Sequence, residues 1–236
     1  MRTRYDSAFT IPEVIFVILL VCVLVFFLIP ISGNICTVQP GLKIGTNGRS
    51  IVYGILQANT EREALGLPPI WPVAETVLDG ETGAVDYTAG FSEKYFADCT
   101  NTETVENFTF ALFAGGGVPT ARNATEFTNG GHNVWSYTGG IPDGADEDTP
   151  FLFTQNFRIT GDDLRHYATV KNKDKSFAAK LNSETMPYRG QSLVFVTRGG
   201  SALYLKAKEL HKPSVFYGNS GQNISTNFSV AVVHPK

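Results

Sequence analysis

The most apolar stretch of the chain lies near its N-terminus. No charged residue occurs between Glu13 and Lys43, and every residue of 14–31 is apolar. A helix needs about 20 residues to cross the hydrocarbon core of a bilayer, and this run is of that length. A helix is the expected form because lipid offers backbone N–H and C=O groups no other hydrogen-bonding partner. The pattern predicts a membrane-spanning helix over 9–31.

The flanks of this run predict its orientation. Arg2 and Arg4 precede it, and positive charge on one flank favours keeping that end in the cytoplasm. The run is longer than the apolar core of a secretory signal peptide, about 7–15 residues, and no A-x-A cleavage site follows it. We expect the helix to stay on the mature protein, with the rest of the chain exported.

The pattern changes after the apolar run. Pro30 removes a helix hydrogen bond and crowds the preceding turn, and several Gly and Pro residues follow it. We expect the first helix to end between Ile29 and Gly33, with an irregular connector over 32–46. A second, amphipathic helix is predicted from about residue 47, capped by Thr46 or Asn47, to Gly66.

The remainder of the chain favours short helices followed by strands. Its clearest element is a hairpin whose arms, 192–197 and 202–206, flank a Gly-containing turn. Short links between strands predict a mostly antiparallel sheet, and hence an α+β domain with the amphipathic helix packed on that sheet. Helices are predicted over 93–99 and 105–113, and further strands over 133–137, 150–156 (with Phe151 and Phe153 on one face) and 225–233.

The residues at the start of the apolar helix carry a resemblance to a known family. Ala8-Phe9-Thr10-Ile11-Pro12-Glu13, followed by an apolar run, resembles the processing site of type IV prepilins and type II secretion pseudopilins. In that family a membrane peptidase cuts before the Phe and methylates the new amino terminus. Cutting after Ala8 makes Glu13 the fifth residue of the mature chain, where the family keeps its glutamate, and many pilins share the proline at Pro30. The family nearly always has Gly where this chain has Ala8.

The resemblance implies a structural subunit of a type IV pilus or a type II secretion-type filament. Its organisation is a prepilin leader over 1–8, a transmembrane and assembly helix over 9–31, the connector over 32–46 and an exported pilin-like α+β domain over 47–236. The implied partners are prepilin peptidase, like subunits, the assembly machinery and membrane lipid, and the implied location is the bacterial inner membrane. The alternative is a single-pass membrane protein with a periplasmic ligand-binding domain that does not polymerise.

A physical interpretation of the Glu13 carboxylate agrees with this resemblance. A carboxylate at the edge of an apolar run costs free energy unless a charge pairs with it. The α-ammonium of another chain can supply that charge, and pairing in a low dielectric then sets the register between stacked subunits. The alternative is that Glu13 lies among lipid headgroups as an ordinary helix-start residue.

The chain has three cysteines. Cys22 lies within the apolar helix, where we expect it to pack as a small residue. Cys36 and Cys99 both fall in the exported part, where disulfides persist, and we predict that they pair. Two unrelated reduced thiols are the alternative.

Few residues elsewhere in the chain suggest a metal, cofactor or catalytic site. The loop 143–148 is acidic, and Asp143, Asp146 and Asp148 could supply oxygen ligands to calcium, as loops of some pseudopilins do. A solvated acidic turn is the alternative, and no other cofactor is indicated. No G-x-S-x-G, H-E-x-x-H or GKS/T motif is present and the four His stand far apart, so we expect no enzyme. The net charge of −3 gives no sign of a nucleic-acid partner.

Overall fold

A computed structural model describes residues 11–169, 176–210 and 230–236, with side chains at all of these positions except 25–40 and 167–169. The chain divides into two compact units, Met1–Pro40 and Gly41–Lys236. One helix, α1 (Ile11–Ala64), contributes residues to both units. Among the described residues, no helix combines the length and the apolar character that crossing a membrane requires.

Helix α1 corrects the predicted connector. It is helical without interruption through Pro30 and through the whole of 32–46. Thr46, predicted to cap a new helix, instead donates its hydroxyl to the carbonyl of Leu42 inside the same helix, at 2.9 Å. An interior proline removes one backbone donor, and from Gly41 onward burial of the helix offsets the low helix propensity of glycine. The helix ends at Ala64 and Gly66 follows with φ +70°, as predicted.

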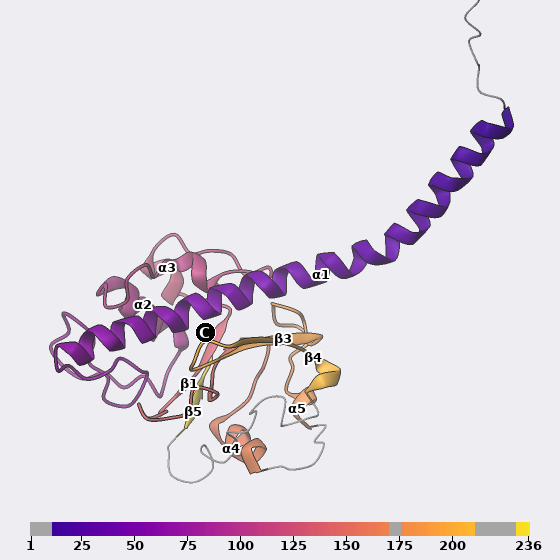
Figure 1. Cartoon of the computed structure of the whole chain (residues 1–236). Helices are drawn as coiled ribbons and strands as arrows, with labels where there is room; N and C mark the ends of the chain where they lie inside the picture. Colours follow the sequence, from indigo (N-terminus) through magenta and orange to yellow (C-terminus); the bar gives the residue numbers. More distant parts are fainter. Residues whose placement is uncertain (1–10, 170–175, 211–229) are drawn as a thin grey trace, which may run out of the picture. The chain divides into compact units, whose positions relative to one another are not determined.

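The second unit is built on a five-stranded sheet in which every paired strand is antiparallel. The strand order is β4-β3-β2-β1-β5, and Figure 1 labels β1, β3, β4 and β5 of this sheet. This confirms the predicted α+β class with an antiparallel sheet. The strands are β1 (Trp135–Gly139), β2 (Pro150–Thr154), β3 (Ser192–Thr197), β4 (Ala202–Lys206) and β5 (Ala231–Val233).

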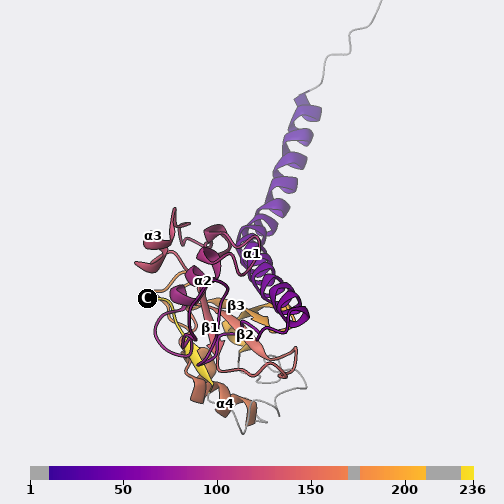
Figure 2. The same cartoon turned by 90° about the vertical axis from the view of Figure 1, so that its left-hand side faces the viewer.

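One face of the sheet packs against the part of α1 that belongs to the second unit. Ile44, Ile51 and Ile55 of α1 join Val194 and Val196 of β3 in one buried cluster. Three shorter elements contribute to the same cluster: α2 (Ser92–Asn101), η1 (Phe110–Phe113) and α3 (Ala124–Thr128), of which Figure 2 labels α2 and α3. Aromatic rings of this cluster stack or meet edge to face, for example Phe96 on Phe113 at 4.7 Å between centroids.

The other face of the sheet has its own helical cover, which the sequence did not predict. Leu193 and Phe195 of β3 point into a second buried cluster with Leu164 and Phe177. Strand β3 therefore buries both alternating sets of side chains, as a strand covered on two faces must. The covering elements are α4 (Gly161–Thr169) and α5 (Ser176–Ala179), and the short helix η2 (Ala207–Glu209) follows β4.

The predicted hairpin is confirmed at both arms, while β1 begins two residues later than predicted and β2 ends earlier, at Thr154. Phe151 and Phe153 were expected on one face but belong to the two different clusters. The reason is a register shift between Pro150 and Leu152, because an extra residue in a strand turns the next side chain to the other face. Of the strand predicted over 225–233, residues 225–229 lie outside the described residues.

The two predicted short helices have different outcomes. Helix α2 is confirmed, although Phe91 rather than Ser92 is its N-cap. The helix predicted over 105–113 is wrong apart from η1. Asn107 has φ +63°, a left-handed conformation that interrupts a helix, and Phe108 and Val105 pack against Gly54 of α1 instead.

Candidate functional site

The processing motif lies at the edge of the described residues. Ala8 and Phe9 fall outside them, so cleavage stays a prediction. Glu13 is exposed in the first turn of α1, where a carboxylate interacts favourably with the helix dipole. The backbone at Pro30 is helical and its side chain lies outside the described residues.

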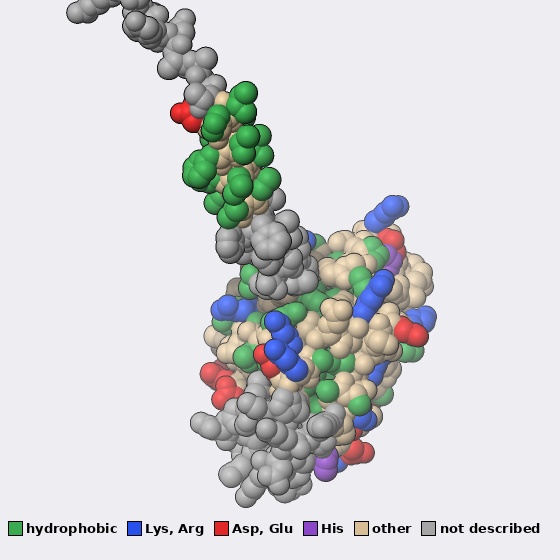
Figure 3. Space-filling view, turned by 90° about the vertical axis from the view of Figure 1, so that its right-hand side faces the viewer, with side chains coloured by type: hydrophobic (Ala, Val, Ile, Leu, Met, Phe, Trp, Pro, Cys, Tyr) green, Lys and Arg blue, Asp and Glu red, His purple; other side chains and the backbone are tan. Residues whose placement is uncertain are grey.

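The first unit presents a helix that is apolar on every side. All side chains of 14–24 are apolar and exposed, including Phe16 at 67% and Val23 at 45%, and Ile11 before them is 78% exposed. Figure 3 shows hydrophobic side chains covering the visible face of this segment. A helix without a polar face belongs in lipid or in a protein core, since soluble monomers rarely expose contiguous apolar surface of this extent. This segment, 14–24, is the main candidate interaction site.

In the second unit, α1 approaches the sheet closely through glycines. Gly41, Gly45 and Gly48 recur at spacings of four and three, which places them on one face of the helix. A Cβ on Gly48 would lie 2.7 Å from the ring of Trp135 and 2.7 Å from a methyl of Val196. The absence of a side chain at Gly48 therefore sets how near the helix backbone lies to strands β1 and β3.

An arginine that no sequence motif marks, Arg62, joins the C-terminal end of α1 to the segment that follows. Arg62 is 4% exposed and forms an ion pair with Asp79. Its Nε donates to the carbonyl of Pro68 and its Nη2 to that of Val77, both at 2.8 Å. These bonds satisfy the buried guanidinium and join the helix to the segment 68–79.

The acidic loop proposed for calcium is organised around a different cation. Arg198 donates from Nη2 to Asp143 at 2.8 Å, and from Nη1 to the carbonyls of Pro142 and Ala145 at 2.8 and 2.9 Å. Its guanidinium also lies 4.5 Å from the ring centroid of Trp71. Burial lowers the pKa of Arg198, and the Asp143 charge acts in the opposite direction.

This geometry favours the turn that was the alternative to calcium. Two carbonyls of the loop and the Asp143 carboxylate accept from Arg198, and the Asp146 carbonyl accepts from Thr149 N at 3.0 Å. Within the described ranges, no three His, Cys, Asp or Glu side chains are grouped to hold a metal ion. Calcium binding by Asp143, Asp146 and Asp148 stays a prediction that this arrangement does not support.

Cys99 contradicts the predicted disulfide. Its thiol is free and the residue is 0% exposed, inside the first core cluster on the inner side of α2. Burial raises the pKa of the thiol above its ordinary value, which keeps it protonated and inert. The side chain of the predicted partner, Cys36, lies outside the described residues, and Cys22 is a free, exposed thiol on α1.

A serine–histidine pair links β1 to the residue that follows β5, with Ser136 buried and His234 half-buried. Nδ1 of His234 is 2.8 Å from Oγ of Ser136, and its Nε2 is 2.8 Å from the carbonyl of Ile159. A carbonyl can only accept, so Nε2 carries the proton and Nδ1 accepts from the serine hydroxyl. Such a pair can activate a nucleophile, but Ser136 is 0% exposed and offers a substrate no approach. The hydrogen bond of this pair instead stabilises the pairing of β5 with β1.

This histidine predicts a loss of stability in acid. Burial, with the nearby charge of Arg158, lowers the pKa of His234 below 6.5. The unfolded chain then binds more protons below about pH 6.5, so the free energy of unfolding falls as the pH drops through that value, by at most about 1.4 kcal/mol per pH unit. Urea unfolding between pH 7.5 and 5.5 measures this slope.

The matched variant is His234→Gln, which cannot titrate. We expect a smaller change in unfolding free energy between pH 7.5 and 5.5 than in the parent chain. The comparison also removes the contribution of Glu93, whose pKa is raised by burial and whose effect on stability has the opposite sign. An unchanged slope in His234→Gln would rule out His234 as the source.

No family model matches the chain, and neither a curated protein nor a solved structure is significantly similar to it. The structure by itself defines an α+β protein with a five-stranded antiparallel sheet. One helix, α1, includes both a fully apolar exposed segment and the residues that pack on the sheet.

Proposed function

We propose that the chain is a structural subunit of a type IV pilus or a type II secretion-type filament. The observation that supports this most strongly is the segment 14–24 of α1, whose exposed side chains are apolar on all sides. It follows directly on Phe9-Thr10-Ile11-Pro12-Glu13, the sequence that resembles the prepilin processing site. An apolar helix and a processing motif at this spacing are both needed for a filament of this type.

Hydrophobic burial supplies the driving force in this proposal. Covering one Val, Leu, Ile or Phe side chain is worth about 1.5–3 kcal/mol, and ten such residues are exposed in 14–24. Before assembly, lipid covers the segment, as part of a transmembrane helix over 9–31. After cleavage between Ala8 and Phe9, the same helices from many copies cover one another in the filament core. Head-to-tail contacts of one kind then build an open helical polymer.

Reconstituted assembly tests the proposal. The full chain, tagged at its C-terminal end, is produced with a prepilin peptidase, an assembly ATPase and a platform protein. We expect sheared, sedimenting filaments that contain the protein, and none when the peptidase is omitted. Processed protein that stays monomeric in the membrane would contradict polymerisation and favour the membrane-anchored binding domain.

A further inference from the structure

The face of α1 turned away from the sheet in the second unit is exposed along its whole length. Exposed residues recur every three or four positions from Leu42 to Ala64, while the intervening ones are buried or half-buried. We call this surface the outer face. Its large and charged members are Leu42, Lys43, Arg49, Tyr53, Glu61 and Glu63.

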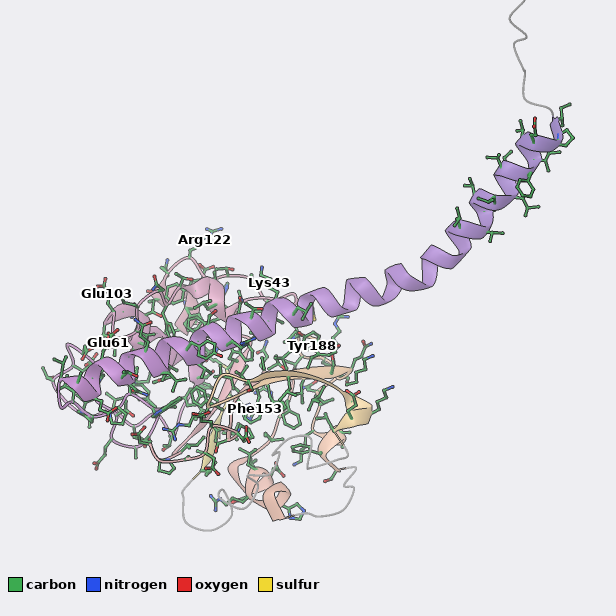
Figure 4. The ribbon with its side chains drawn as sticks, viewed as in Figure 1. Lys43, Glu61, Glu103, Arg122, Phe153 and Tyr188 are labelled. Carbon is green, nitrogen blue, oxygen red and sulfur yellow. The ribbon has the colours of Figure 1, made fainter. Side chains whose placement is uncertain are left out.

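Charge is separated along the outer face. Lys43 and Arg49 lie toward its beginning, and Glu61 and Glu63 lie within the last turn of the helix (Figure 4 labels Lys43 and Glu61). Within the described part of the chain, none of these four side chains forms an ion pair. Glu61 accepts a hydrogen bond from Gln57 at 3.0 Å, and Arg49 donates to Tyr53 at 3.4 Å, so their charges are not neutralised on the helix itself.

Stability of the helix does not account for this order of charges. Acidic side chains near a helix C-terminus meet the partial negative charge of the last carbonyls, which is unfavourable by a few tenths of a kcal/mol. A surface that keeps two glutamates there is better explained by an external partner that carries positive charge. The beginning of the same face offers such a surface on a second copy of the chain.

We propose that the outer face is a self-complementary contact between successive copies in the filament. Lys43 and Glu61 are 18 residues apart, which is five helical turns, so they lie on one line about 27 Å apart. A parallel copy displaced by that distance sets Lys43 of one copy opposite Glu61 of the next. Arg49 and Glu63, about 21 Å apart, form the second pair because their long side chains span the difference. This contact rests on the proposed function, since it needs parallel copies.

Charge reversal tests the contact in the full chain, with the sedimenting fraction as the readout. Lys43→Glu and Glu61→Lys each place like charges together, and we expect each to lower assembly at least about tenfold. The double variant restores opposite charges between copies and should recover most of the loss. Rescue cannot arise within one chain across about 27 Å. Arg122→Glu, an exposed reversal on another part of the second unit, is the matched control and should assemble normally.

Crosslinking distinguishes an open polymer from a closed dimer. A Lys43→Cys and Glu61→Cys chain, with Cys22→Ala and Cys36→Ala to remove other thiols, is oxidised after assembly. A ladder of dimers, trimers and longer species is expected, whereas antiparallel pairing would stop at dimers and overturn the proposal. If the parent chain assembles but the reversals have no effect, this contact is wrong and the proposed function stands. If the parent chain does not assemble, the proposed function itself fails.

Discussion

Gly48→Ala is expected to destabilise the second unit by about 1–3 kcal/mol, the usual range for overpacking a core. A Cβ at this position meets the Trp135 ring and the Val196 methyl at 2.7 Å, and both of these side chains are fully buried. The neighbouring strands cannot yield without disturbing the centre of the sheet. The clash outweighs the roughly 1 kcal/mol that alanine gains over glycine in a helix.

Gly45→Ala is the matched control on the same helix face. Its Cβ would lie 3.6 Å from Ala202 and 3.9 Å from Val194, which is ordinary van der Waals contact. This variant is therefore expected to be as stable as the parent or more stable, by up to about 1 kcal/mol. Urea unfolding of the full chain in detergent, followed by tryptophan fluorescence, compares the two. Equal effects at both positions would show that α1 does not lie as close to β1 and β3 as described.

Glu13→Gln should insert into the membrane normally and fail to assemble. The substitution keeps the shape of the side chain and removes the charge that is proposed to pair with the amino terminus of a neighbouring copy. Breaking a buried ion pair by neutralising one partner costs about 3–5 kcal/mol, so the polymer should be reduced by two or more orders of magnitude.

The measurement for Glu13→Gln compares the membrane fraction with the sheared filament fraction. Glu103→Gln, an exposed carboxylate in the second unit, serves as the control and should match the parent chain. Filaments of Glu13→Gln at parental levels would contradict charge pairing and leave Glu13 as an ordinary helix-start residue.

Local sequence patterns predicted those elements for which the apolar pattern and the turn residues indicate the same structure. The β3–β4 hairpin is an example, because two alternating arms flank Arg198-Gly199-Gly200-Ser201 and nothing distant competes with them. The end of α1 is another, since Gly66 adopts the left-handed conformation that terminates a helix.

The wrong predictions arise where tertiary packing overrides the preference of the local sequence. Gly41, Gly45 and Gly48 suggested a break or a turn, yet all three lie inside α1, and Gly48 lets the helix approach the sheet closely. The second helical layer was not predicted. Both alternating sets of side chains on β3 are apolar, but the sequence of a single strand does not show which elements cover each face. Arg198 could have been found only by knowing that the hairpin turn lies beside the acidic loop.

The proposed function requires that this chain is processed as a prepilin and assembles through its apolar helix. Intact-mass and N-terminal analysis of the protein from native membranes tests it most directly. We expect a chain that begins at methylated Phe9, with the first eight residues removed. A chain that still begins at Met1, in cells whose prepilin peptidase processes other substrates, would contradict it.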